Sequence, residues 1–317
     1  MIEPGELSVT SGSWLRPVTS TPAVPRWGHV DGIQVGLHPI PGPRGLLRIF
    51  APYLGDPHRD RLLNFIAIEP IPKGATERGF SELEQSALDG APGKRFWSTD
   101  SLDDLRPVAP DRPAQGVVSL RDGIEELSVF VISEVFENGA SVAVELRFRA
   151  DHPHEVSLTA TRLERSVELD YCILSATMGN YPRLRRVELA DAVVTPSGLW
   201  PGFTGAAFTE HAVFGVHRLP RNAAGEVEVT ATPDESDPGA AVYAPEVDEH
   251  WRYVGRRAAQ TWIADEPDPG LALLLNARAA YWASTAPIPG GPSFENFELR
   301  EPFREGRTFR FRVEPLD

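Results

Sequence analysis

The feature that most constrains this sequence is a strict alternation of side chains over residues 141–149. Val142, Val144, Leu146 and Phe148 alternate with alanine, glutamate and arginine. Successive side chains of a strand point to opposite faces, whereas a helix would scatter these apolar residues around its axis. The run therefore predicts a strand with one buried and one exposed face.

Similar apolar runs recur at short intervals from about residue 115 onward. They lie at residues 156–163, 168–177, 183–194, 207–217, 227–232, 258–264, 271–276, 294–299 and 307–313. The 30 prolines and 27 glycines are dispersed along the chain, as expected of turns between short strands. No repeat of fixed period indicates a propeller or solenoid. The pattern predicts an all-β protein: a large antiparallel β-sandwich, super-sandwich or jelly-roll-like, with one or two short helices.

The first 114 residues follow a different pattern, with many Pro, Gly, Ser and Thr residues in the first 45 and only two strand-like runs, at residues 46–50 and 62–69. A serine at 81 and a glutamate at 84 form a capping box, and Gly90 supplies a stop, so we expect a short helix there. No linker stands out. We expect a single domain over residues 1–317, in which an irregular section, 1–114, packs on the strands of 115–317.

The charge of the chain restricts its partners. With 31 basic and 45 acidic residues, the formal net charge is −14, which argues against nucleic acid as a partner. Cys172 stands alone in an apolar run and predicts a buried thiol, with no disulfide. No run approaches the roughly 18 apolar residues of a membrane span, so we expect no membrane partner. The start lacks signal-peptide features, which predicts a cytoplasmic protein or an exported one whose signal peptide has been removed.

One group of candidate catalytic residues lies at 180–185, where an apolar run ends and the next begins. Tyr181 beside Arg183 and Arg185 is the chemistry needed to remove a proton next to a carboxylate, because a guanidinium lowers the pKa of a phenol and neutralises the acid group. His29 or His38 would be a second proton-transfer group. This arrangement predicts β-elimination by a polysaccharide lyase. The alternative interpretation is a Gly-Asn turn followed by solvated arginines.

A second group consists of carboxylates. A glycoside hydrolase needs two carboxyl groups beside the scissile bond, about 5–5.5 Å apart for retention or about 6.5–9.5 Å apart for inversion. The candidates are Glu69, Glu82, Glu84, Glu295 and Glu298. Any two of them could serve, and the sequence does not indicate which of them meet. Glu84 already has a structural role in the predicted capping box.

Metal and cofactor signals are weak. Residues 151–155, Asp-His-Pro-His-Glu, resemble a ligand cluster, but no distant His or Cys spacing completes a zinc pattern, and a turn between two strands explains them. The glycine-rich motifs of nucleotide-binding proteins are absent from the sequence. We therefore predict no metal site and no cofactor, with a structural calcium ion left open.

Sugar binding combines aromatic rings, which stack on the apolar face of a pyranose, with polar groups that bind its hydroxyls. The residues predicted to bind substrate on this basis are Asn180, Arg48, Tyr53, Trp97, Trp282 and Glu295.

Residues 50–54, 64–70, 79–84 and 294–299 resemble segments of bacterial proteins found among sugar-degrading genes. In length and strand density the whole chain resembles the galactose-mutarotase-like super-sandwich shared by several lyases and epimerases. The catalytic histidine and glutamate of the epimerases are not matched to positions here. Together these features predict a carbohydrate-active enzyme that acts on an oligo- or polysaccharide. The first hypothesis is a polysaccharide lyase that cleaves a uronic-acid-containing glycan by β-elimination. A glycoside hydrolase with a Glu pair and a non-catalytic glycan-binding protein are the alternatives.

Overall fold

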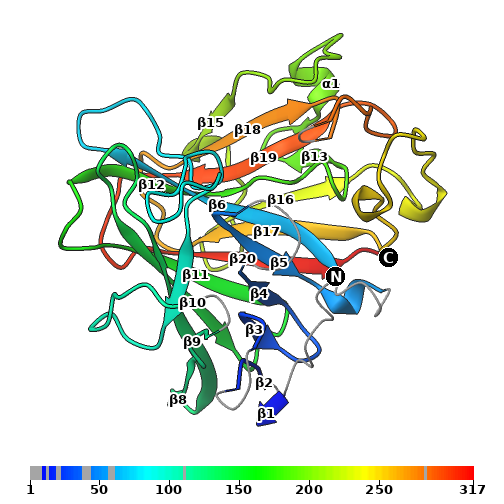
Figure 1. Cartoon of the computed structure of the whole chain (residues 1–317). Helices are drawn as coiled ribbons and strands as arrows, with labels where there is room; N and C mark the ends of the chain where they lie inside the picture. Colours follow the sequence, from blue (N-terminus) through cyan, green and yellow to red (C-terminus); the bar gives the residue numbers. More distant parts are fainter. Residues whose placement is uncertain are drawn as a thin grey trace.

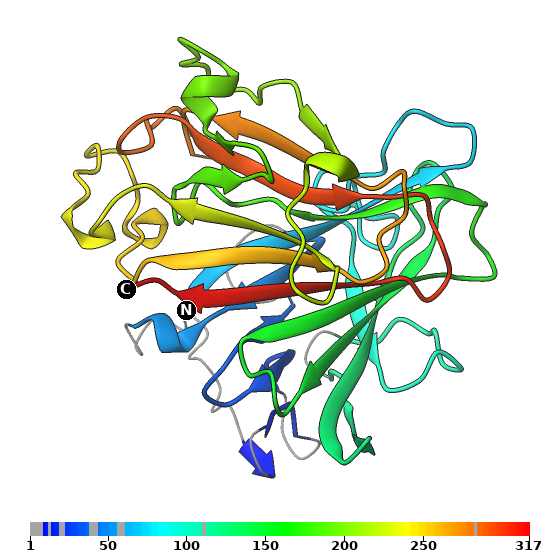
Figure 2. The ribbon, with the colours of Figure 1, turned by 180° about the vertical axis from the view of Figure 1, so that it is seen from behind.

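The computed structural model describes residues 9–11, 14–18, 23–37, 44–55, 61–109, 112–281 and 284–317. These residues form two large antiparallel sheets packed face to face. The first sheet is nearer the viewer in Figure 1, and the second is nearer in Figure 2. The fold class predicted from the sequence is therefore confirmed.

The first sheet contains ten strands. In spatial order they are β1 (Val9–Ser11), β2 (Trp14–Leu15), β3 (Arg26–His29), β4 (Gln34–Gly36), β5 (Leu46–Phe50), β6 (Leu62–Pro72), β12 (Leu169–Ala176), β19 (Ser293–Arg300), β18 (Ala272–Arg278) and β15 (Ala212–Gly215).

The second sheet also contains ten strands. In order these are β14 (Val193–Val194), β13 (Leu184–Glu188), β16 (Val227–Pro233), β17 (Ala258–Ala264), β20 (Thr308–Pro315), β11 (Glu155–Arg162), β10 (Val142–Arg149), β9 (Ile124–Ser133) and β7 (Phe96–Thr99), with β8 (Val117–Arg121) pairing on β9. The described residues contain one α-helix, α1 (Pro196–Leu199), and the 3₁₀ turns η1 (Pro52–Leu54), η3 (Val216–Arg218), η4 (Pro238–Ala240) and η5 (Glu249–Trp251).

The core lies between the sheets. On β10, Val142, Val144, Leu146 and Phe148 are all fully buried and belong to one cluster that draws residues from both sheets, which confirms the alternation found in the sequence. The indole nitrogen of Trp262 on β17 donates to the carbonyl of Phe297 on β19 at 2.8 Å, so it joins one sheet to the other.

The first 114 residues are more regular than the sequence predicts. They supply β1 to β7, and β1 to β6 are six of the ten strands of the first sheet. Strands β3, β4 and β5 are buried at every residue. A strand buried on both faces shows no polar alternation, which is why the sequence pattern missed β3 and β4, although the apolar run of β5 was recognised.

The helix predicted from Ser81 is wrong, because residues 81–90 form turns. The hydroxyl of Ser81 accepts from the amide of Ile68 at 2.9 Å and donates to the carbonyl of Gly45 at 2.5 Å. The carboxylate of Glu84 accepts from the amides of Phe80 and Glu137. Tertiary partners therefore take up the groups that a capping box would have used.

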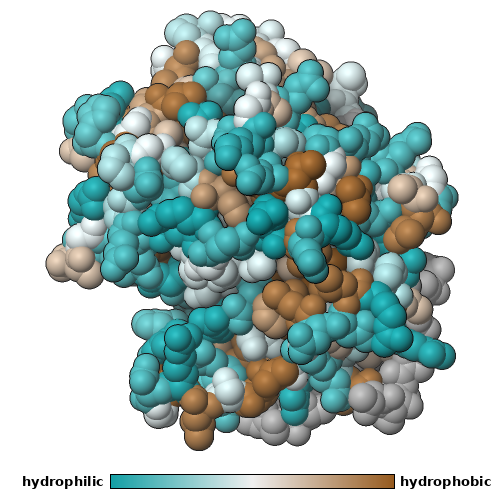
Figure 3. All heavy atoms as spheres, turned by 90° about the vertical axis from the view of Figure 1, so that its left-hand side faces the viewer, coloured by the Kyte–Doolittle hydropathy of each residue, from teal (hydrophilic) through white to brown (hydrophobic). Residues whose placement is uncertain are grey.

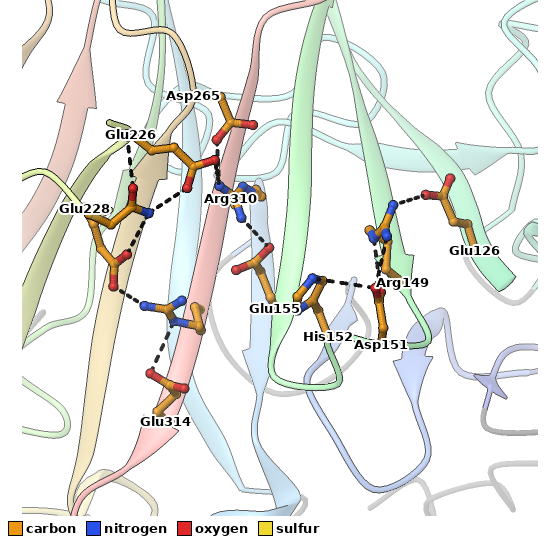
Figure 4. A network of polar contacts seen from close by, with 12 residues as sticks. Glu126, Arg149, Asp151, His152, Glu155, Glu226, Glu228, Asp265, Arg310 and Glu314 are labelled. Atoms are coloured by element: carbon orange, nitrogen blue, oxygen red, sulfur yellow. Dashed lines mark hydrogen bonds and ion pairs between the residues drawn. The ribbon is translucent and has the colours of Figure 1, made fainter. Parts of the chain in front are cut away.

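The outer face of the second sheet carries a network of ion pairs (Figure 4). Arg310 on β20 contacts Glu155, Glu226 and Asp265 at 3.2, 2.8 and 2.6 Å, and Arg312 pairs with Glu228. Cations and carboxylates thus meet in mutual contact on this partly exposed face.

The surface of the molecule at the left of Figure 1 is mostly hydrophilic, with apolar residues in scattered patches (Figure 3). No helix within the described residues is long and apolar enough to cross a membrane.

Candidate functional site

The outer face of the first sheet carries two carboxyl groups that are almost completely buried. Strand pairing aligns Ala67, Ser175 and Glu298 in one row across β6, β12 and β19. Glu69, two residues further along β6, points to the same side. Both glutamates are almost fully enclosed.

One arginine joins these two carboxylates. The guanidinium of Arg78, from the segment after β6, pairs with Glu69 and lies 2.8 Å from Glu298. Burial raises the pKa of Glu69 well above its usual range, the nearby Glu298 and Glu82 raise it further, and Arg78 opposes them. Carboxyl groups thus outnumber the cation that holds them. We call Glu69, Arg78, Glu298 and the neighbouring His211 the acidic cluster.

His211 connects this cluster to the next part of the face. Its Nε2 lies 3.7 Å from a carboxylate oxygen of Glu298 and 3.3 Å from the side-chain nitrogen of Asn276. Burial lowers the pKa of His211, against the pull of Glu298. The amide oxygen of Asn276 accepts from the backbone of Asn296, whose own side chain accepts from the hydroxyl of Thr177 at 3.0 Å. A chain of polar contacts therefore runs from His211 to Thr177.

Thr177 lies in a hollow on this face. Its lining combines apolar and aromatic residues with two acids: Leu46, Phe65, Glu82, Leu83, Thr177, Met178, Phe208, Trp251 and Glu295. Leu83 and Phe208 are exposed at its mouth. The enclosed part measures about 40 Å³, room for about one water molecule beside the carboxyl groups.

The two acids of the hollow, Glu82 and Glu295, both hold protons more tightly than usual. Burial raises the pKa of Glu295 to about 8, and Arg278, 4.0 Å away, opposes this. Burial also raises the pKa of Glu82 to about 7, while hydrogen bonds from its own backbone and from Ser81 favour the ionised form. Glu82 therefore ionises before Glu295 as the pH rises.

The sequence named the carboxylates of this face without showing that they meet. Residue Arg78 was missed, because nothing local distinguishes it from other loop arginines. Thr177, Phe208 and Trp251 were also missed as site residues, since each reaches the hollow only through the tertiary fold. Glu84 lies apart and pairs with Lys94 at 3.1 Å.

The predicted lyase residues lie outside the hollow and make core contacts, hydrogen bonds and ion pairs. Tyr181 packs in the core, its ring edge-on to Tyr253. Arg183 is fully buried and bonds to Glu235, to the hydroxyl of Tyr243 and to the carbonyl of Pro238.

Arg185 and Asn180 are buried as well. Arg185 pairs with Asp234 at 3.1 Å and donates to the carbonyls of Pro289, Gly291 and Pro292. None of Asn180, Tyr181, Arg183 and Arg185 is among the residues that line the hollow.

The remaining candidates are dispersed. His29, a predicted proton-transfer group, packs between Trp14 and Phe148, and burial lowers its pKa to about 4. It does not line the hollow. Trp97 is buried in a small second cluster. Tyr53 stacks on His154 and donates to the carbonyl of Val313. His38 and Trp282 lie outside the described residues.

Arg48 is closer to the hollow, because its guanidinium lies over the ring of Phe65, which forms part of the wall. Burial lowers the pKa of Arg48 to about 10. Of the residues predicted from the sequence, the structure thus gathers five on one face: Glu69, Glu82, Glu295, Glu298 and Arg48. Within the described ranges no group of three or more His, Cys, Asp and Glu side chains is arranged to hold a metal ion.

Comparisons with known proteins add little to this geometry. No family model and no curated protein matches the sequence. A solved structure described as "Crystal Structure Analysis of HI1317" shares 12% sequence identity, with 95% of this chain and 99% of that chain covered, at a TM-score of 0.25. A likeness at this TM-score carries no argument about fold or function.

Proposed function

We propose that this protein is a carbohydrate-active enzyme that hydrolyses a glycosidic bond with Glu82 and Glu295. The observation that carries the proposal is that two carboxyl groups with raised pKa values line one hollow. Glycosidic hydrolysis needs one carboxylic acid and one carboxylate beside the bond, and such a pair is set up when the surroundings favour different protonation states.

The roles of the two residues follow from their surroundings. Glu295, with its higher pKa, is the acid that protonates the leaving oxygen. Glu82, whose anion receives hydrogen bonds, is the carboxylate that acts as base or nucleophile. The rings of Phe208 and Trp251 offer apolar surface on which a sugar ring can stack.

Hydrolysis accounts for this site better than the lyase prediction. The residues that line the hollow include two acids and, among those that the structure describes, no arginine, lysine or histidine. A uronate carboxylate at the scissile bond would therefore meet like charge once Glu82 has ionised. Tyr181 and Arg183, the proposed lyase pair, are engaged in core and ion-pair contacts instead.

The test is a panel of oligosaccharides and polysaccharides assayed both for new reducing ends and for the absorbance of an unsaturated product. We expect reducing ends without unsaturation. Glu295→Gln and Glu82→Gln should each lower the rate by about 100-fold or more, the usual contribution of a positioned acid or base. The matched control is Glu164→Gln on an exposed loop residue, which should retain wild-type turnover.

Three other results would contradict the proposal. Unsaturated products would restore the lyase prediction, and wild-type rates in both Glu variants would remove the pair from the mechanism. Saturable binding of a glycan without turnover would instead favour a glycan-binding protein.

A further inference from the structure

A second cavity, larger than the hollow, shares one lining residue with it. It measures about 320 Å³, which is within the range of small-molecule sites. Its lining residues are Arg44, Gly45, Leu46, Asp89, Lys94, Arg95, Phe96 and Ala109. Leu46 lines both this cavity and the hollow, so both spaces reach this residue.

The cavity is basic, although the protein as a whole carries a formal charge of −14. Three cations, Arg44, Lys94 and Arg95, line it together with one acid, Asp89. Arg44 gives its Nη1 to both carboxylate oxygens of Asp89, at 2.9 and 3.1 Å, while its buried Nη2 has no hydrogen-bond partner among the described residues. An unpaired buried donor is costly, so an acceptor within its reach would be favoured.

The other two cations also retain donors. Lys94 is 2% exposed and contacts Glu84 at 3.1 Å and the carbonyl of Gln85 at 2.9 Å, and an ammonium group has three hydrogens. Arg95 donates Nη2 to the carbonyl of Val108, and a guanidinium has five donors. Converging arginine and lysine side chains in a cleft are the usual means of binding an oxyanion.

We propose that this cavity binds an anionic substituent, a carboxylate, sulfate or phosphate group, on a sugar residue next to the bond that is cleaved. The inference rests on the proposed function for the sugar, but the anion site itself can be tested alone. It makes the substrate a charged glycan whose neutral part lies over the Glu82–Glu295 hollow and whose charge lies against Arg44, Lys94 and Arg95.

Calorimetric titration of the full chain with inorganic phosphate, sulfate and acetate at low salt tests the site. We expect saturable binding that weakens by about tenfold in Arg44→Gln and in Arg95→Gln, the loss typical of one charged hydrogen bond. Arg121→Gln, an exposed arginine on β8, removes the same charge elsewhere and should bind as the wild type does. Preference for phosphate, sulfate or acetate identifies the substituent.

A variant that gains binding excludes misfolding as the explanation. Asp89→Asn removes the acid that competes for Arg44, so it should bind the anion more tightly than the wild type. The absence of saturable binding for all three anions, or equal weakening in Arg121→Gln, would overturn the anion site. The proposed function fails separately, if anions bind here while no glycan is hydrolysed.

Discussion

Glu295 holds a carboxyl group in an almost closed environment, with 1% of the residue exposed. Burial raises its pKa from 4.5 to about 8, so the folded protein keeps a proton that the unfolded chain has lost. Stability from this proton is fully present below pH 4.5 and is lost as the pH rises through about 8.

Glu295→Gln should remove this pH dependence, because an amide of similar shape stays neutral throughout. Between about pH 5 and about pH 9 the wild type should lose stability relative to the variant by a few kcal/mol, on the order that linkage gives for such a shift. Urea unfolding of both proteins at both pH values measures it. Glu164→Gln should leave the wild-type dependence intact, and an equally steep loss in Glu295→Gln would show that Glu295 is ionised in the folded state.

At this scale the sequence predicted the chemical type of the site residues but not their grouping. Glu69 and Glu295 were candidates because carboxylates near strand ends suit acid–base chemistry, yet so were Tyr181 and Arg183. All four side chains are buried, so the difference between them lies in the partners that they contact. Arg183 bonds to Glu235, 52 residues away, and such long-range contacts leave no local signature.

Among the larger elements, the segment of residues 79–95 carries Glu82 to the site. Ser81 fixes it to β6 and to Gly45, and Gly45 has a φ of +70°. A Cβ at Gly45 would lie 1.8 Å from the carbonyl oxygen of Ser81. This close approach lets the segment contact the start of β5.

Gly45→Ala should therefore destabilise the protein more than a positive φ alone requires. Gly74→Ala is the matched control, because Gly74 has a φ of +75° and open space around its Cβ position. We expect a cost of about 1 kcal/mol for Gly74→Ala and a cost several kcal/mol larger for Gly45→Ala, together with lost turnover. Thermal unfolding of both variants measures the difference, and equal midpoints would contradict the close contact.

Strands were predictable where one of their faces is exposed. The alternation of β10 was visible because its outward residues are polar. Strand β5 was visible as an apolar run, but the short strands β3 and β4 were not predicted, since their burial on both faces leaves no alternation of polar and apolar residues. The sequence of the turns at 81–90 resembles a capping box, because Ser and Glu at that spacing can also make tertiary hydrogen bonds instead of capping a helix.

The whole molecule is organised around one core shared by the two sheets. Trp262 on β17 lies in this core, with its ring 4.8 Å from that of Phe311 and its indole bonded across to β19. Loosening this contact should weaken both sheets together.

Trp262→Phe should cost about 2 kcal/mol or more, through lost volume and an unpaired carbonyl at Phe297. Trp97→Phe is the control, because Trp97 lies in the smaller cluster and its indole nitrogen has no partner among the described residues. Urea unfolding followed by far-ultraviolet and near-ultraviolet circular dichroism should show coincident transitions that shift more for Trp262→Phe. Separate transitions would indicate that the sheets unfold independently.

The strand order also determines when the fold can form. β19 lies between β12 and β18, and β20 between β11 and β17, so the last two strands of this sequence fill the middle of the two sheets. Until residues 293–315 have been synthesised, each sheet exists as two separate parts with unpaired edges. A growing chain of this kind must postpone its final folding until nearly all of these strands have left the ribosome, and during that interval it depends on chaperones or on speed to avoid aggregation.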